Sequence, residues 1–284
     1  MAHIAFLGTG LLGGAFAEAA ARRGDTVTAW NRTHDKVLAL GPAGVKAAAS
    51  PADAVRGAAR VHVVLRDDDV VEEVLAQARA ALDAAAVIVD HSTTLPARTA
   101  ARAARYAAEG VAYLHCPVFM GPPAALKAQG IMLACGPRAL FDRAQADLAR
   151  MTGRLEYLGE RADLAAVHKL LGNATLIGMW GVLADVLTLA KASGIGLDDA
   201  LEGLGRLDLN AALARRGAAM AAGDFTPNFE LTMARKDVGL MQALADGLPL
   251  AALPAVGARM DALIAAGHGA KDAAVLAIDA LGGR

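Results

Sequence analysis

Three glycines near the start of the chain give its most specific chemical signal. A short apolar run, Ile4–Leu7, leads into Gly8-Thr9-Gly10-Leu11-Leu12-Gly13, and a stretch of helical composition comes next. After a strand, the first glycine permits a tight turn, the second lets a pyrophosphate approach the backbone, and the third allows close packing of helix on strand. The N-terminus of that helix would face the negative charge. All six residues of the motif are therefore predicted to bind a dinucleotide: Gly8, Thr9, Gly10, Leu11, Leu12 and Gly13.

The end of the second expected strand indicates which dinucleotide binds. An NAD site usually carries Asp or Glu there, about 20 residues after the glycines, to hold the ribose 2′-hydroxyl. This sequence has Asn31, Arg32 and Thr33 instead, so no carboxylate repels a 2′-phosphate. The guanidinium of Arg32 offers a fork of donors to such a phosphate, and its two neighbours add neutral hydrogen bonds. The sequence predicts NADP(H), and the alternative is a solvated Arg32 with NAD accepted equally.

A cation and an amide occur four residues apart in a strongly apolar segment. Lys169 and Asn173 lie within Asp163–Ala192, which is predicted to form one helix that is apolar nearly all round. A spacing of four places both side chains on one face of that helix. Such polar groups are costly on an apolar helix unless they line a cleft, so the pair is a candidate for acid–base chemistry. The alternative is a lysine whose buried stem carries its head to solvent.

The elements that must position these residues change in character along the chain. Short β-branched or apolar runs alternate with helical stretches through the first half, which is typical of a parallel sheet with crossover helices. The sheet is predicted to end near Leu155–Leu158. The runs are Ile4–Leu7, Val27–Trp30, Val61–Leu65, Val87–Val89, Ala112–His115 and Ile131–Ala134.

Beyond about Asp163 the pattern is helical throughout. Further helices are expected at roughly 197–222, 229–245, 254–266 and 272–281. The fold class is thus α/β, with an N-terminal Rossmann-type dinucleotide-binding domain over residues 1–162. An all-α domain comes after it over residues 163–284, beginning with a long interdomain helix. Because that helix is too apolar to face water, we expect a homo-oligomer, a dimer or tetramer, that shares it.

The composition excludes several classes of protein. A length of 284 residues suits about two domains, and a formal net charge of −1 argues against a nucleic-acid partner. The apolar stretch Ala174–Ala184 is shorter than the ~20 residues of a membrane span, so no membrane partner is expected. The N-terminus lacks a cationic signal-peptide region. Cys116 and Cys135 fit no metal-ligand spacing, which predicts buried thiols, a cytoplasmic protein and no metal site.

Several segments together resemble the β-hydroxyacid dehydrogenase family of the 6-phosphogluconate dehydrogenase superfamily. This family includes 3-hydroxyisobutyrate dehydrogenase and the glyoxylate/succinic semialdehyde reductases. The resemblance covers nearly the whole chain and implies a Rossmann domain, a helical domain and an active site between them. Beyond the glycine motif it is carried by Asp90–Thr94, Cys116–Val118, His168–Asn173, Lys236-Asp237 and Asp272.

The resemblance implies roles for particular residues. It makes Lys169 the general acid and base, Asn173 a residue that holds the substrate, and Thr93 a neighbour of the nicotinamide ribose. It also implies that Lys236 reaches the cofactor and that Asp237 belongs to the substrate site. The alternative roles are a helix cap for Thr93 and an ordinary surface charge cluster for the later pair.

Other candidates come from strand ends and from departures from the family. Leu65 and Arg66 end the third expected strand, where open α/β sheets bind ligands, so we include them as cofactor contacts. The family carries a serine and two glycines where this chain has Phe119, Met120 and Gly121, which become the candidate substrate contacts. Because the hydroxyl is lost and Met adapts to irregular shapes, a larger, apolar carbonyl compound fits better than a short hydroxyacid.

The functional prediction is an NADPH-dependent oxidoreductase that transfers a hydride between the nicotinamide and a carbonyl or alcohol substrate. The substrate would be a semialdehyde, a 3-hydroxyacid or a larger apolar aldehyde or ketone. One alternative is an imine reductase, a related group that usually lacks the lysine, so Lys169 disfavours it. Another is a non-catalytic NADP-binding module, which the Lys169 and Asn173 pair disfavours.

Overall fold

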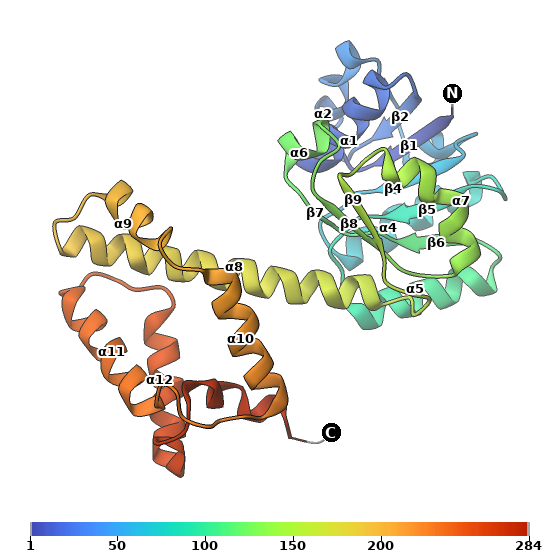
Figure 1. Ribbon diagram of the computed structural model, residues 1–284. Coiled ribbons are helices and arrows are strands. Elements are labelled where there is room, and N and C mark those ends of the chain that lie inside the picture. Colours follow the sequence, from blue (N-terminus) through green and yellow to red (C-terminus); the bar gives the residue numbers. More distant parts are fainter. Residues whose placement is uncertain (1, 283–284) are drawn as a thin grey trace. The chain divides into compact units, whose positions relative to one another are not determined.

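The structure is a computed structural model that describes residues 2–282 (Figure 1). The chain forms two compact units, Met1–Asn173 and Ala174–Arg284. The first unit contains both β-sheets, and the second is helical. This arrangement confirms the predicted fold class of a Rossmann-type domain followed by a helical domain.

The main sheet of the first unit has six parallel strands in the order β3-β2-β1-β4-β5-β6. This order is that of a doubly wound dinucleotide-binding sheet, whose ligands bind at the carboxyl ends of the strands. The strands are β1 (His3–Leu7), β2 (Thr26–Trp30), β3 (Lys46–Ala47), β4 (Arg60–Val63), β5 (Val87–Asp90) and β6 (Ala112–His115).

Apolar residues cover both faces of this sheet, as burial on two sides requires. Along β1, Ile4 and Phe6 belong to one apolar core, whereas Ala5 and Leu7 belong to the other. The helices of the unit are α1 (Leu11–Arg22), α2 (Asp35–Leu38), α3 (Pro51–Val55), α4 (Asp68–Ala78), α5 (Pro96–Ala108), α6 (Pro122–Leu126) and α7 (Arg138–Ala149), with 3₁₀ turns at Gly41–Ala43 and Arg79–Ala81.

A second, small sheet lies in the same unit. It has the order β7-β8-β9, in which β7 (Val118–Phe119) is antiparallel to β8 (Ile131–Ala134) and β9 (Arg154–Tyr157) is parallel to it. The sequence predicted β8 and the region of β9, but it wrongly placed them in the one parallel sheet, and it did not predict β7. Two-residue strands such as β7 and β3 are too short to produce a periodic pattern.

The long helix α8 (Leu164–Ala192) begins in the first unit. Ala165 and Ala166 are fully buried, and Ala165 packs against Leu133 and Cys135 of the small sheet region. The first turns of α8 therefore belong with the sheets. The boundary between units falls at 173/174, inside the helix, whereas the sequence placed the domain boundary at 162/163, just before it.

The rest of α8 is apolar and largely uncovered within the chain. Of the described helices it is the one long and apolar enough to cross a membrane by length and composition alone, because it continues past Asp185 to Ala192. Only 6% of its most apolar 18-residue window is buried. Asp185 itself is buried and accepts hydrogen bonds from the backbone N–H groups of Ala251, Ala252 and Leu253.

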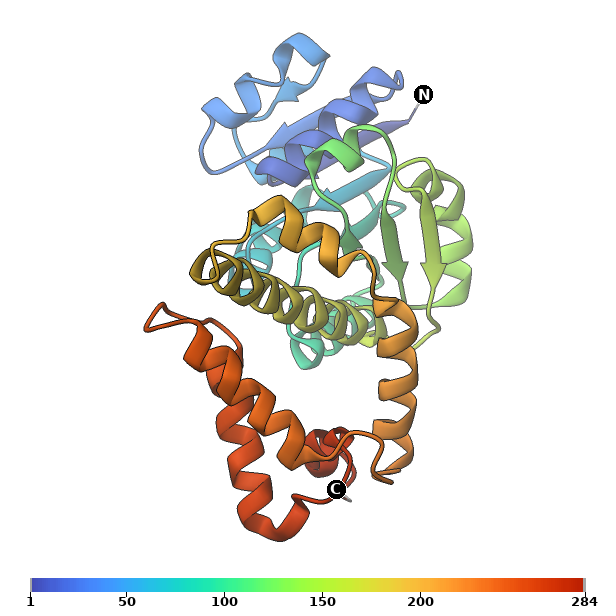
Figure 2. The ribbon, with the colours of Figure 1, turned by 60° about the vertical axis from the view of Figure 1, so that its left-hand side comes forward.

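The second unit is built from short helices around a small core. The sequence predicted one helix over 197–222, but the structure has two, because Asp208 caps a new helix by accepting a hydrogen bond from the Ala211 N–H. Helices α11 and α12 lie side by side (Figures 1 and 2). The helices are α9 (Leu197–Leu204), α10 (Leu209–Ala222), α11 (Leu231–Leu244) and α12 (Leu253–Leu263), followed by a π-helical turn, Ile264–His268, and a 3₁₀ segment, Ala273–Ala280.

Candidate functional site

A cleft of ≈ 450 Å³ lies at the carboxyl ends of the central strands of the first unit. Its lining comes from the glycine turn, the end of β2, the segment between β4 and α4, and the turn after β5. The structure therefore brings together cofactor candidates from four separate parts of the sequence. Those that line the cleft are Gly8, Gly10, Leu11, Leu12, Gly13, Asn31, Arg32, Thr33, Leu65, Arg66 and Thr93.

The three glycines of the motif are required for different reasons. Gly8 has φ +97°, and a Cβ there would lie 2.2 Å from the Val64 carbonyl oxygen. A Cβ at Gly13 would lie 2.1 Å from the Gly8 oxygen. A Cβ at Gly10 would meet no atom within 4 Å, and Gly10 caps the N-terminus of α1 without a side-chain hydrogen bond. The space above Gly10, beside free helix N–H groups, fits a dinucleotide phosphate.

Thr9 lies inside the motif but does not line the cleft. It is buried, and its backbone N–H donates to Asn31 Oδ1 at 3.1 Å. Asn31 Nδ2 in turn donates to the Thr33 carbonyl oxygen at 3.1 Å. Asn31 thus ties the glycine turn to the end of β2, a structural role that its sequence position alone did not indicate.

Two exposed cations stand at the end of β2. Arg32 lies just after the strand, and Lys36 lies on α2. Both line the cleft, and neither forms an ion pair with any residue that the structure describes. Lys36 is not among the residues predicted from the sequence, although its position four residues after Arg32 was a usable signal. The two together form a cationic edge suited to a phosphate.

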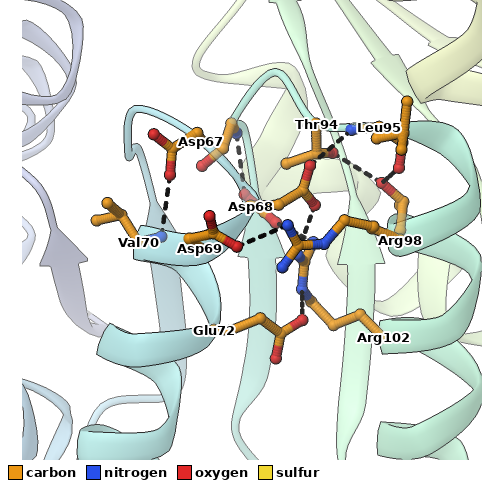
Figure 3. Close-up of polar contacts among 12 residues, drawn as sticks. Asp67, Asp68, Asp69, Val70, Glu72, Thr94, Leu95, Arg98 and Arg102 are labelled. Carbon is orange, nitrogen blue, oxygen red and sulfur yellow. Dashed lines mark hydrogen bonds and ion pairs between the residues drawn. The ribbon is translucent and has the colours of Figure 1, made fainter.

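The two turns that border the cleft after β4 and β5 are held by a buried arginine (Figure 3). Arg102 of α5 is fully buried and donates to Asp68 at 2.7 Å, to Glu72 at 2.8 Å and to Asp90 at 3.5 Å. Asp68 also accepts from the Leu95 N–H at 2.8 Å. Burial alone would lower the pKa of Arg102, but the surrounding acidic groups and the Tyr113 hydroxyl raise it above its usual value.

Thr93 lies in the turn after β5, which borders the cleft. Helix α5 begins after Leu95 without a side-chain cap, so Thr93 does not cap it. Thr93 is exposed and lines the cleft, whereas Thr94 is buried and hydrogen-bonded to Thr99 at 2.7 Å. The position of Thr93 therefore fits a cofactor contact better than a structural one.

A buried histidine pair lies beneath the cleft. His91 lines it, and its Nδ1 donates to the Cys116 carbonyl oxygen at 2.7 Å. Its Nε2 therefore accepts from His62 Nδ1 at 2.9 Å. Burial lowers the pKa of His91 to about 4, so the ring is neutral near pH 7. Both nitrogens of His91 are used in this way, which makes it a structural residue.

The catalytic candidates Lys169 and Asn173 lie on the first turns of α8 and are half-buried. Lys169 Nζ lies 4.1 Å from the centroid of the Phe119 ring, and burial lowers the pKa of the ammonium. Phe119 also packs on Gly172, where a Cβ would lie 2.3 Å from its Cζ. The structure thus joins two sequence candidates, Lys169 and Phe119, that are 50 residues apart in the chain.

The remaining candidates are placed separately. Met120 is half-buried against the first core, and Gly121 is exposed at the start of α6. Lys236 and Asp237 lie on α11 in the second unit, where they pair with each other at 3.0 Å. Their roles toward cofactor and substrate stay predictions. Asp272 is buried and accepts hydrogen bonds from the backbone of residues 228 and 229, so it stabilises the second unit.

Comparison with known proteins identifies the relatives of this chain. Residues 3–159, more than half of the chain, match the NAD binding domain of 6-phosphogluconate dehydrogenase. The chain belongs to this family. The predicted resemblance to the β-hydroxyacid dehydrogenases is confirmed, and the protein is an NAD(P)-dependent oxidoreductase.

The similar proteins are named either as semialdehyde reductases or as imine reductases. Glyoxylate/succinic semialdehyde reductase 1 of Arabidopsis thaliana is 28% identical over 267 residues, which cover 88% of this chain and 89% of the relative. The solved imine reductase of Streptomyces aurantiacus is 27% identical with a TM-score of 0.87, covering 99% of this chain and all of that one. The imine reductase of Myxococcus stipitatus in complex with NADP⁺, 24% identical with a TM-score of 0.85 over 97% and 98% of the two chains, shares the fold.

Proposed function

We propose that this protein is an NADPH-dependent reductase of aldehydes or ketones, with oxidation of the corresponding alcohol as the reverse reaction. The substrate is a semialdehyde, a 3-hydroxyacid or a larger apolar carbonyl compound. One observation carries the proposal: the chain keeps a half-buried lysine ammonium, Lys169, on the unit that also holds the dinucleotide cleft. The experiment that tests it is a screen of purified protein and NADPH against these carbonyl classes and against cyclic imines.

In this proposal Lys169 supplies the acid–base chemistry. A dinucleotide held by the residues of the cleft would supply or take up the hydride. The Lys169 ammonium donates a hydrogen bond to the carbonyl oxygen, offsets the negative charge that develops there and transfers its proton to form the alcohol. In the reverse direction the neutral amine takes that proton. Asn173, one helical turn later, donates a hydrogen bond that orients the substrate.

The preference for NADPH rests on the cationic edge at the end of β2. Changing Arg32 to alanine is expected to raise the KM for NADPH about 10- to 150-fold and to change the KM for NADH little, because a charge-assisted contact to the 2′-phosphate contributes roughly 1.5–3 kcal/mol. The measurement is steady-state kinetics with both cofactors. Arg56→Ala, which removes an exposed arginine that does not line the cleft, is the control. Equal losses with NADPH and NADH would remove Arg32 from the specificity role.

A second candidate function is the reduction of C=N bonds. The similarity to the Streptomyces aurantiacus imine reductase over nearly the full length of both chains favours it, as do the apolar side chains of Phe119 and Met120. The presence of Lys169 disfavours it, because an imine nitrogen is basic enough to be protonated without a dedicated lysine. The screen separates the two functions directly by the substrate that turns over.

We further propose that the protein is a homodimer or larger oligomer joined through α8 and resides in the cytoplasm. Apolar side chains on its second part are exposed within the chain, including Ile177 (58%) and Trp180 (59%). Burying such a surface stabilises association by about 25 cal/mol per Å² of apolar area, before the entropy loss on association is counted. The cytoplasmic location is supported by Cys116 and Cys135, which are buried and form no disulfide.

The assembly can be tested in solution. Light scattering at micromolar concentration is expected to give at least twice the mass of the 28.9 kDa chain. Trp180→Glu should convert the assembly to monomer, because a carboxylate would be buried without a partner. Leu126→Glu, at a partly exposed leucine of α6, should leave it intact. A native monomer at this concentration would contradict the proposal.

A further inference from the structure

The aromatic ring beneath Lys169 is the main partner of its ammonium within the first unit. Nζ lies 4.1 Å from the Phe119 ring centroid, well inside the ~6 Å range of a cation–π contact. Among the described residues of this unit, no carboxylate pairs with Lys169 and no group hydrogen-bonds to it. The orientation of the ammonium therefore depends on the ring.

The ring itself is packed against two parts of the chain. Phe119 packs against the buried cluster of Leu133, Cys135 and Ala165. It also lies against Gly172, where even a methyl group would lie 2.3 Å from Cζ and 2.7 Å from Cε1. Gly172 lies three residues after Lys169 and so on the same face of α8. The missing side chain at position 172 makes the space that the ring fills.

We propose that Phe119 is the positioning residue of Lys169. This inference rests on the function proposed above, in which Lys169 is the acid.

The electrostatic character of the ring supports this role. The electron-rich face attracts the ammonium and restricts a flexible four-carbon side chain that would otherwise sample many rotamers.

The positioning role is tested by replacing the ring while keeping its apolar bulk. Phe119→Leu is expected to lower kcat for reduction of hexanal by NADPH about 3- to 30-fold, the range of a partly desolvated cation–π contact. It should also move the basic limb of the pH profile to lower pH, because the ring favours the charged lysine. Phe119→Tyr, which keeps the aromatic face, should restore both values. Phe225→Leu is the matched control, since the Phe225 ring makes a similar contact in the second unit. There Lys271 Nζ lies 5.9 Å from the ring centroid.

A second variant, Gly172→Ala, retains both Lys169 and Phe119. Its added methyl group should displace the Phe119 ring, so we expect the same lowered kcat and the same shifted pH limb as in Phe119→Leu. An unchanged pH profile in both variants would overturn the positioning role. The outcome is distinct from failure of the proposed function, which would show as an unchanged rate in Lys169→Ala.

Discussion

Replacing Lys169 by alanine is expected to lower kcat for carbonyl reduction by about 10²–10⁴-fold, the usual contribution of a positioned general acid. The dissociation constant for NADPH should change little, because the dinucleotide cleft is lined by the glycine turn, the end of β2 and the turns after β4 and β5. Stopped-flow single-turnover rates and fluorescence titration with NADPH measure the two quantities separately.

Matched variants make this result specific. Lys191→Ala, at the exposed lysine near the end of the same helix, should keep the native rate. Lys169→Arg should not restore the rate, because a guanidinium keeps its proton at any working pH. If Lys169→Ala left reduction of both aldehydes and imines unchanged, the lysine would be structural and the proposed mechanism wrong.

The direction of the pH dependence can be derived from the burial of this lysine. Burial lowers the pKa of Lys169 below the ordinary value for a lysine. Reduction uses the ammonium, so its rate should fall as pH rises through that lowered pKa. Oxidation of the alcohol uses the free amine, so its rate should fall as pH drops through the same pKa. Opposite pH limbs for the two directions are therefore expected.

Replacing Arg102 by methionine is expected to cost about 3–5 kcal/mol of the free energy of unfolding. The change keeps a long apolar stem but leaves two buried carboxylates without their cation. One is that of Asp68 (Figure 3), and the other is that of Asp90. Urea unfolding gives the difference in stability directly. Because the two turns that Arg102 joins also line the cleft, affinity for NADPH should fall as well.

The neighbouring arginine of α5 provides the control. Arg98 pairs with Asp69 at 2.6 Å, but its side chain is 43% exposed and that of its partner 84%. An exposed pair of this kind contributes at most about 1 kcal/mol, so Arg98→Met should be nearly neutral. Similar losses in the two variants would show that burial of the Arg102 network adds nothing to stability.

The sequence predicts the sheet unit well, because its strands are buried and have strong apolar patterns. The predicted runs Ile4–Leu7 and Ala112–His115 match β1 and β6 to within a residue. The break between α9 and α10 was not predicted, because the composition of Leu197–Ala222 favours a helix on both sides of the break. Its cause is a local capping bond at Asp208, which competes with a continuous helix.

The site was predictable where its residues are close in sequence, and not where they meet only in the fold. The glycine motif and Arg32 carry a local signal. The contact of Lys169 with Phe119 and the pairing of Arg102 with Asp68 join residues 50 and 34 positions apart, and no short sequence pattern links the members of either pair. Such pairs depend on how helices and strands pack, which a single sequence does not encode in any short pattern.

The position of the boundary between the two units determines which residues are exchanged when a chimera is built from two relatives. A chimera joined at 162/163, where the sequence changes character, would import the donor's lysine together with its helices. A chimera joined after Asn173 would keep the acid and the ring beneath it in the recipient and replace only the helical unit. Grafts at the second junction should therefore transfer assembly without rebuilding the chemistry.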